Sequence, residues 1–513
     1  MLQSIQTLKE TKNKDLFISV KQRIKKITLD NGLRVILMQN GSNPTVALYW
    51  KILAGSSDET ESNAGIAHML EHMLFKGTKI VGTIDYEREK KYLDVLNRWY
   101  HRLDDYKAQL KQNQVHSKEK LQELEKKIQN LERRISLIEN EVKKFQISEE
   151  DSIIYSIHGQ RGYNAYTSKD VTNYQIELPS NKIELWAKLE SDRVKNSVFR
   201  EFYTERNVVA EERMMRVENN PISFTMEKLL EAIYQGHPYG FPTIGRMENI
   251  ITFKVEQAEE YYKNFYRPEN TVIGMVGNFD EEEAIQILKK YFGDWENPKE
   301  PMKRSIPTSI LHQNRKVVLK INKEGSPILL LAWLKPNFPQ KEDLVLGILA
   351  DVLVGRPDTR LEKTIIQKEQ LATQIQVYTS YPGERYENLF LMFVYPNLSL
   401  LKNPQDEEEL LNLYQRVQDG ILRELQNIQE HGLDEKELER VKQLYLTNFI
   451  KQMRSNSYLA EILTYSELVY GDYHLIFDYY NQIENISVKD VQEVIRNYLS
   501  FEKMSRAVLI PKK

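Results

Sequence analysis

Apolar residues recur along the chain at two different spacings, and these spacings predict a mixture of strands and helices. Residues 27–38 predict a β-hairpin around an Asp-Asn-Gly turn, and residues 46–54 predict a longer apolar strand. Residues 65–75 predict a helix, because apolar residues recur there every three or four positions. Strand-like residues 162–177 and helical residues 185–217 follow. The first half therefore mixes strands and helices without a regular strand–helix–strand repeat.

A charged stretch with three prolines at 297–307 is the predicted linker, and the order of elements then starts over. Two similar halves indicate an internal duplication. We predict the α+β fold class, with two homologous α/β sandwiches of mostly antiparallel sheet and helices. The predicted domains are residues 1–299 and residues 300–513.

Residues 85–150 differ from the rest of the chain because they are very rich in Lys, Glu and Gln. Apolar residues recur there in steps of three and four on both sides of a polar break at 113–117, which is a heptad pattern. This pattern predicts an antiparallel helical hairpin inserted into the N-terminal domain. A hairpin with so many charged residues is typical of a solvated structural arm. The alternative is a docking arm for a partner chain.

The composition narrows the classes of function. The 513 residues include 71 Lys plus Arg and 74 Asp plus Glu, so the net charge is −3. A nucleic-acid-binding protein would usually carry a basic excess, and this class is disfavoured. No apolar run approaches the ~20 residues of a membrane span, and the N-terminal segment has no signal-peptide core. The chain as given is expected to be cytoplasmic, or periplasmic if a leader was removed.

The absence of cysteine restricts any metal site to histidine and carboxylate ligands. His68 and His72 lie four residues apart in the predicted helix, so both imidazoles can reach one ion, with Glu71 close by. Zinc bound by two histidines and one carboxylate keeps a fourth position for water. The ion lowers the pKa of that water toward ~7, and a nearby Glu can take its proton. The alternative is a pair of surface histidines that flank a salt-bridging Glu71.

A carboxylate pair further along offers the third ligand. Glu205 and Glu212 are seven residues apart, which is nearly two helical turns, so they share one helix face. Two carboxylates on a buried face need a cation or hydrogen-bond donors. One can bind the metal while the other accepts a histidine N–H. The alternative is an ordinary charged helix surface that includes Arg206 and Arg213.

The sequences HMLEHMLFKGT at 68–78 and ERNVVAEE at 205–212 strongly resemble the inverted motif of the insulinase/pitrilysin-type zinc peptidases, the inverzincins. The resemblance covers the whole first half, and mitochondrial processing peptidase is a relative. It implies two homologous domains that form half of a clam shell, with one Zn²⁺ on the first. It also implies His68, His72 and Glu212 as zinc ligands, Glu71 as the general base, and Glu205 as an acidic residue behind the ligands.

Family members bind the substrate peptide as an added strand at the edge of a sheet near the metal. Asn164 and Ala165 match that edge strand. Strand addition suits peptides without a fixed sequence. The alternative is an ordinary strand of the sheet.

The chain departs from the family in two ways. The gap between His72 and Glu212 is longer than usual, and the helical hairpin accounts for the excess. Active members also carry an Arg and a Tyr in the second domain that hold the substrate and the oxyanion, whereas Ile366 and Thr373 stand at the matching positions. The alternative is a shifted register in which Arg360 or Tyr378 serves.

The predicted function is a zinc endopeptidase acting on extended or unstructured peptides. The predicted partner is a homologous subunit that supplies the Arg/Tyr pair in a heterodimer, and a homodimer is possible. One alternative is a non-catalytic or weakly active scaffold subunit of a peptidase complex. Another is a coiled-coil interaction protein whose function lies in the hairpin. The second half has no paired histidines among His312, His431 and His474, so one zinc per chain is expected.

Overall fold

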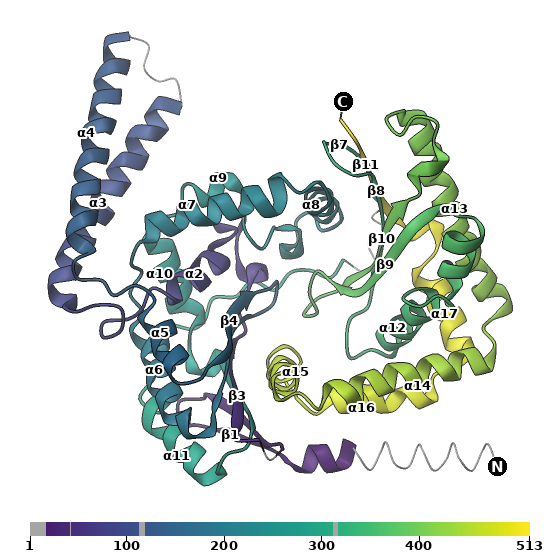
Figure 1. The fold of residues 1–513 in the computed structure, drawn as a ribbon, viewed down its shortest axis with the longest axis horizontal. Helices are drawn as coiled ribbons and strands as arrows, with labels where there is room; N and C mark the ends of the chain where they lie inside the picture. The colour runs from purple at the N-terminus through teal and green to yellow at the C-terminus, as the bar shows by residue number, and fades with distance from the viewer. Residues whose placement is uncertain (1–16, 42, 112–117, 311–315, 513) are drawn as a thin grey trace.

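The chain forms two β-sheets with helices packed on them (Figure 1). The computed structural model describes residues 17–41, 43–111, 118–310 and 316–512. The first sheet has six strands in the order β1-β2-β6-β3-β5-β4, and the second has five in the order β7-β11-β8-β10-β9. The strands are β1 (Ile24–Thr28), β2 (Arg34–Gln39), β3 (Thr45–Ile52), β4 (Arg161–Thr167), β5 (Thr172–Pro179), β6 (Thr271–Gly277), β7 (Val318–Asn322), β8 (Ile328–Lys335), β9 (Ala372–Tyr381), β10 (Asn388–Pro396) and β11 (Ser505–Ile510).

The direction of strand pairing reveals the duplication. In the first sheet β2 lies parallel to β6, and the other described pairs are antiparallel. In the second sheet β7 lies parallel to β11, and the other described pairs are again antiparallel. The series β2-β6-β3-β5-β4 therefore matches β7-β11-β8-β10-β9 strand for strand. The predicted α+β class with two similar, mostly antiparallel sheets is confirmed.

Helices cover both sheets, and each half of the chain covers the other half's sheet with one helix. Apart from the hairpin, the described helices of the first half are α2 (Ile66–Leu74), α5 (Glu150–Ile157), α6 (Ile183–Asn196), α7 (Phe202–Arg213), α8 (Pro221–Ile233), α9 (Met247–Ile250), α10 (Val255–Phe265) and α11 (Glu281–Phe292). In the second half they are α12 (Lys341–Leu353), α13 (Glu407–His431), α14 (Glu435–Gln452), α15 (Asn456–Val469), α16 (Leu475–Asn481) and α17 (Val488–Tyr498).

The exchanged helices are α15, which packs on β3 and β6 of the first sheet, and α8, which packs on β11 of the second. Gly274 of β6 permits the first contact, since a Cβ atom there would lie 2.4 Å from Thr464 Cγ2. One apolar core consequently extends from Tyr49 in the first sheet to Trp333 in the second. The predicted domain division at 299 and 300 thus lies between the two sheets in sequence, whereas the packing crosses it.

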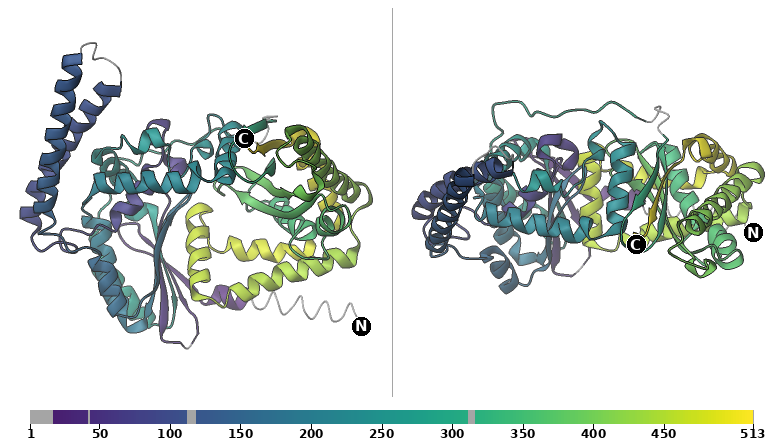
Figure 2. Two further views of the ribbon diagram at one scale, coloured as in Figure 1. Left: turned by 45° about the horizontal axis from the view of Figure 1, so that its top comes forward. Right: turned by 90° about the horizontal axis from the view of Figure 1, so that it is seen from above.

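The predicted helical hairpin is confirmed. Its helices α3 (Tyr86–Lys111) and α4 (Lys118–Val142) project from the body of the molecule (Figures 1 and 2). They share an apolar cluster that includes Leu96, Leu103 and Leu131. The polar break predicted at 113–117 lies outside the described residues. Among the described helices, none is long and apolar enough to cross a membrane.

Candidate metal centre

The two histidines lie on α2, and the start of this helix is fixed by its backbone surroundings. Gly65 has a φ of 102°, and a Cβ atom there would lie 2.5 Å from Gly245 Cα, so glycine is required. Glu59 accepts hydrogen bonds from the N–H groups of Gly65 and Ala67, both at 2.8 Å. These bonds satisfy N–H groups that the first helical turn leaves free. Burial raises the pKa of Glu59 to about 8.

The helix buries its apolar side in the core and brings both histidines close to α7. The buried apolar residues are Ile66, Ala67, Met69, Leu70, Met73 and Leu74. His68 Nε2 lies 3.8 Å from Glu212 Oε2, and His72 Nε2 lies 3.5 Å from the same oxygen. The structure therefore brings together all three side chains that the sequence predicts as ligands.

The geometry of these three side chains fits a tetrahedral metal ion. Their ligand atoms lie within 4.8 Å of one another, and no other such group occurs among the described residues. Ligands about 2.0–2.2 Å from zinc stand roughly 3.3–3.6 Å apart in a tetrahedron, close to the separations of 3.8 and 3.5 Å between Glu212 and the two histidines. Glu212 Oε2 is buried and has no hydrogen-bond partner in the described part of the chain. A cation would compensate this otherwise costly burial.

Glu205 lies behind His72. Its Oε2 atom is 3.3 Å from His72 Nδ1, and its Oε1 atom is 2.5 Å from Lys76 Nζ. Glu205 thereby orients the imidazole so that Nε2 faces Glu212. The contact with Lys76 was missed at the sequence level, although a residue four positions after His72 is expected on the same face.

The pKa values of the two histidines are shifted in opposite directions. Burial and the neighbouring His72 lower the pKa of His68 to about 4. Burial also opposes protonation of His72, but the contacts with Glu205 and Glu212 outweigh it and raise the pKa of His72 to about 9. The site thus concentrates negative charge around His72, as expected for a place that accepts a cation.

The side chain of Glu71, on α2, reaches the end of β4, the edge strand of the first sheet. Thr167 Oγ1, at the end of β4, donates a hydrogen bond to Glu71 Oε2 at 2.7 Å. Burial raises the pKa of Glu71. A partly buried carboxylate beside two histidines has the properties of a general base.

Asn164 and Ala165 lie on β4, at the edge of the first sheet. They pair with Gln175 and Tyr174 of β5, and Asn164 is exposed whereas Ala165 is buried. Within the described sheet β5 is the single neighbour of β4, so the other side of β4 is free to pair with a further strand. This strand also packs against α2.

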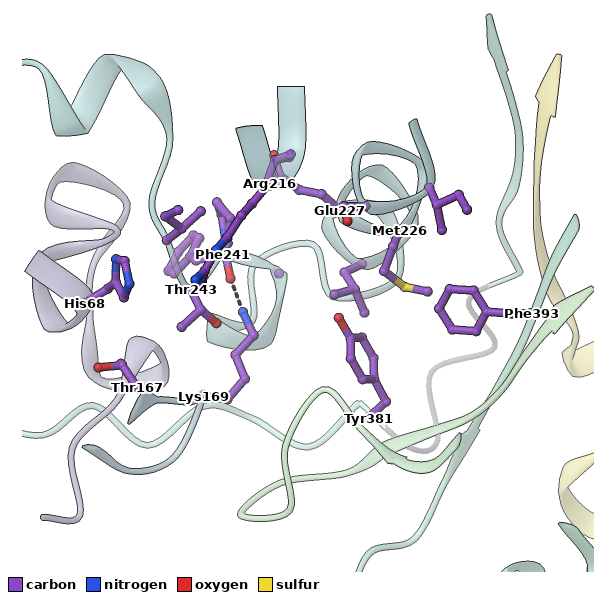
Figure 3. A pocket seen from close by; sticks show the side chains of 17 residues that line it. His68, Thr167, Lys169, Arg216, Met226, Glu227, Phe241, Thr243, Tyr381 and Phe393 are labelled. Atoms are coloured by element: carbon purple, nitrogen blue, oxygen red, sulfur yellow. Dashed lines mark hydrogen bonds between the residues drawn. The ribbon is translucent and has the colours of Figure 1, made fainter. Parts of the chain in front are cut away.

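A cavity of about 390 Å³ opens beside His68 (Figure 3). Lys169 lines it near His68, and Tyr381 and Phe393 of the second sheet line its far end. Arg216 also lines it and contacts Glu212 Oε1 at 2.9 Å. The cavity therefore extends from α2, which carries both histidines, to the second half of the chain. Arg216 was not identified from the sequence, although it stands four residues after Glu212.

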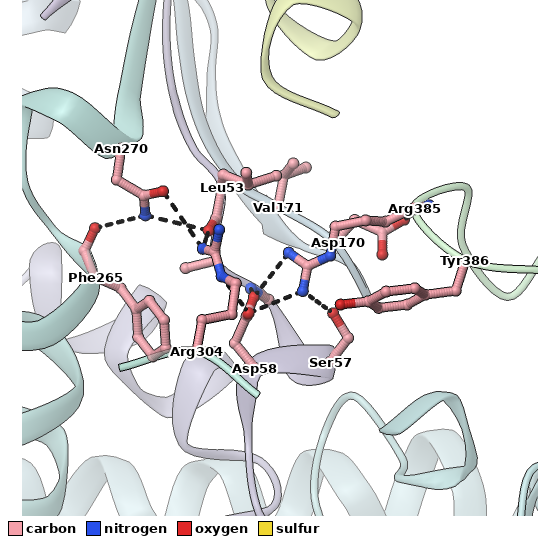
Figure 4. A network of polar contacts seen from close by, with 12 residues as sticks. Leu53, Ser57, Asp58, Asp170, Val171, Phe265, Asn270, Arg304, Arg385 and Tyr386 are labelled. Atoms are coloured by element: carbon pink, nitrogen blue, oxygen red, sulfur yellow. Dashed lines mark hydrogen bonds and ion pairs between the residues drawn. The ribbon is translucent and has the colours of Figure 1, made fainter. Parts of the chain in front are cut away.

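A buried polar network joins the two halves close to this cavity (Figure 4). Arg385 donates to the two carboxylate oxygens of Asp58 at 2.8 and 3.1 Å. Asp170 accepts hydrogen bonds from the Glu384 N–H at 2.6 Å and from the Tyr239 hydroxyl at 2.7 Å. These contacts hold the loop between β9 and β10 against the first half.

Ile366 and Thr373 stand at the positions that are expected to match the Arg/Tyr pair of active family members. Ile366 lies in the π-helical segment η7 (Glu362–Lys368) and packs against the core, and Thr373 lies on β9. Arg360 donates to both carboxylate oxygens of Glu437, at 2.9 and 2.5 Å. Tyr378 is 47% exposed on β9. Arg360, one of the two alternatives, therefore already forms an ion pair with Glu437.

The remaining histidines of the second half add no metal site to the described residues. His431 and His474 belong to no group of metal-ligating side chains there. His312 lies outside the described residues.

Family models match both halves of the chain. The model of insulinase (peptidase family M16) matches residues 34–95 and 153–246. The model of the peptidase M16 inactive domain matches residues 252–445. The gap at 96–152 falls on the helical hairpin, as expected for an insertion into the family fold.

Full-length similarity to individual proteins agrees with these matches. Zinc protease PqqE of Helicobacter pylori is 23% identical, covering 94% of this chain and 92% of its own length. The uncharacterized zinc protease YmxG of Bacillus subtilis is also 23% identical, covering 95% of this chain and 98% of its own.

Solved structures share the fold. A protease from Helicobacter pylori has a TM-score of 0.72 at 22% identity, covering 95% of this chain and 99% of that chain. The periplasmic protease PqqL of Escherichia coli has a TM-score of 0.67 at 19% identity, covering 96% of this chain and 48% of that chain. With both halves matching models of one family, and relatives along the full length named as zinc proteases, the chain belongs to the insulinase/pitrilysin-type peptidase family M16.

Proposed function

We propose that the chain is a zinc-dependent endopeptidase that hydrolyses extended or unstructured peptides, with one Zn²⁺ held by His68, His72 and Glu212. The observation that carries this proposal is the close set of three ligand atoms, with Glu71 on the same helix as both histidines. The names of the relatives, which are zinc proteases, support it.

Side chains around the proposed metal suit the activation of water and the two proton transfers of hydrolysis. Zinc, when bound, supplies a Lewis acid that polarises the peptide carbonyl and eases deprotonation of water. Glu71 takes a proton from the attacking water as the water oxygen bonds to the carbonyl carbon. Glu71 then passes this proton to the leaving amine as the C–N bond breaks. Glu205 keeps His72 oriented, and Thr167 holds one oxygen of Glu71 in place.

The peptide is proposed to bind as an added strand along the free side of β4, next to Asn164 and Ala165. Main-chain hydrogen bonds supply affinity in this mode, so it suits substrates without a fixed sequence. Thr167 supports the proposal, because a peptide on this edge would run past the residue that contacts Glu71.

We further propose that the chain is the metal-bearing subunit of a heterodimer, in which a homologous subunit supplies the Arg/Tyr pair. Ile366 is aliphatic and Thr373 is short, so neither substitutes for those donors. The match to 48% of PqqL supports a pairing of two such units, because that chain is about twice as long. Each unit would comprise the domains 1–299 and 300–513, and a second copy of this chain is the other candidate partner.

The second candidate function is a non-catalytic or weakly active scaffold subunit. The same positions, Ile366 and Thr373, favour it. An intact Glu71 beside the two histidines favours the endopeptidase.

The test compares wild type and Glu71→Gln, each alone and with a co-encoded homologue, by zinc content and by cleavage of an unstructured peptide. Wild type with its partner is expected to cleave, whereas Glu71→Gln keeps zinc and loses cleavage by several orders of magnitude. Retained turnover by zinc-bound Glu71→Gln would show that another base acts. Full activity of the isolated wild-type monomer would show that the chain needs no Arg/Tyr pair from a second subunit. Inactivity of the zinc-bound wild type with every partner tested would favour the non-catalytic scaffold subunit.

A further inference from the structure

The helical hairpin is fastened to α7, the helix that carries Glu205 and Glu212. Tyr100 of α3 stacks on Tyr203 of α7, with ring centroids 4.0 Å apart and an angle of 11° between the planes. One turn further along α3, Asp104 accepts two hydrogen bonds from Arg206, at 2.8 and 3.1 Å. Because Arg206 directly follows Glu205, these contacts fix the turn of α7 that bears Glu205.

The hairpin is also fastened to the end of α2. Glu89, near the start of α3, is fully buried and accepts a hydrogen bond from Arg200 Nε at 2.7 Å. Arg200 in turn donates to the carbonyl oxygens of Lys76 and Thr78, at 3.0 and 2.6 Å, just beyond α2. Lys76 contacts Glu205, which orients His72. A continuous series of contacts therefore joins the hairpin to a proposed zinc ligand.

Both arginines depend on the hairpin for their counter-charges. Arg200 is 2% exposed and Arg206 is 8% exposed. Removing the carboxylate partner of a buried guanidinium leaves an uncompensated charge, so the guanidinium must move or the helix beneath it must shift. In contrast, Lys107 and Glu132 pair at 2.8 Å within the hairpin, and both are nearly half exposed. This pair has no contact with α2 or α7 among the interactions described and offers a matched control.

We propose that the hairpin positions the metal centre, with Asp104 and Glu89 acting as positioning residues for Glu205 and His72 through Arg206, Arg200 and Lys76. The proposal rests on the proposed zinc site. It gives the insertion a role inside the catalytic domain, in place of a purely solvated arm. Neither Asp104 nor Glu89 touches the ligands, so each acts through the arginine that it binds.

The experiment measures the zinc affinity of the full-length chain by competition with a chelator of known affinity. The variants are Asp104→Asn, the control Glu132→Gln, which removes the same charge from the hairpin, and the conservative Asp104→Glu. The visible spectrum of the cobalt-substituted chain is a second readout, because it depends on ligand arrangement and not on global stability. The zinc-induced rise in melting temperature, taken against each variant's own metal-free form, corrects for general destabilisation.

We expect Asp104→Asn to weaken zinc binding about tenfold and to alter the cobalt spectrum, because it disturbs Glu205, the residue that contacts His72, and loss of such a contact typically costs about 10- to 100-fold in metal affinity. Glu132→Gln should match wild type within about twofold, and Asp104→Glu should recover part of the loss. Wild-type affinity with an unchanged cobalt spectrum in Asp104→Asn would overturn the inference alone. If Asp104→Asn does not fold, Tyr100→Leu takes its place. This variant removes the ring stack and the hydrogen bond from the Tyr100 hydroxyl to Glu139 but keeps the ion pair of Asp104 with Arg206, and its zinc affinity and cobalt spectrum are judged in the same way. Failure of the wild-type chain to bind zinc would instead overturn the proposed function and the inference together.

Discussion

The hydroxyl of Thr167 donates a hydrogen bond of 2.7 Å to Glu71, a residue 96 positions earlier in the sequence. The contact joins the edge strand proposed to bind peptide to the carboxylate proposed to move the proton. It also leaves one carboxylate oxygen of Glu71 fixed, so that the other can act.

Replacing Thr167 with valine should lower the rate of peptide cleavage by about 10- to 100-fold, with zinc content unchanged. The variant keeps the shape of the side chain and removes its donor, and a hydrogen bond to a charged group contributes about 1.5–3 kcal/mol. Steady-state cleavage by the chain with its partner measures the effect. Thr167→Ser keeps the hydroxyl and is the control, and equal rates for Thr167→Val and wild type would contradict a role in orienting Glu71.

His68→Ala and Glu212→Gln should each lose most bound zinc, because three protein ligands are needed to hold the ion firmly. Metal analysis of the dialysed proteins checks this stoichiometry. The control is His431→Ala, which changes an exposed histidine at the end of α13. Full zinc occupancy in both ligand variants would show that the ligand assignment is wrong.

Glu205→Gln should weaken zinc binding about 10- to 100-fold while leaving the three ligands in place, because the partner that orients His72 loses its charge. Chelator competition measures the affinity. Glu211→Gln changes an exposed carboxylate on the same helix and should behave as wild type. An unchanged affinity in Glu205→Gln would mean that His72 is oriented without it.

Arg385→Met should lower the free energy of unfolding by about 1–3 kcal/mol, since the buried side chain of Asp58 loses two hydrogen bonds and keeps the one from Arg304. Urea denaturation followed by fluorescence measures the change. Arg423→Met is the control, because Arg423 pairs with Glu369 on the surface and such pairs contribute about 1 kcal/mol or less. Equal losses in the two variants would contradict a structural role for the network between the halves.

Much of the fold could be predicted from local spacing. The helical period of residues 65–75 locates His68 and His72 on one helix, and the heptads of residues 85–150 predict the hairpin. Prediction was less complete where distant segments decide the local structure. The spacing predicts that residues 185–217 are helical, and the structure divides this stretch into α6 and α7, with residues 197–201 between them. The break occurs where Ser197 pairs with Thr78 and the Val198 N–H donates to Gly77 O at 3.1 Å.

The sequence by itself determined the features that depend on neighbours within two helical turns or one strand. These are the shared face of His68 and His72, the shared face of Glu205 and Glu212, and the two helices of the hairpin. The order of the elements predicted in this way also indicated the duplication. Only the tertiary structure decided the exchange of α8 and α15 between the sheets, the contact of Thr167 with Glu71, and the ion pairs of Asp104 and Glu89 with Arg206 and Arg200. The physical reason is that periodicity fixes which side of an element is buried, whereas the partner on that side depends on how all the elements pack together.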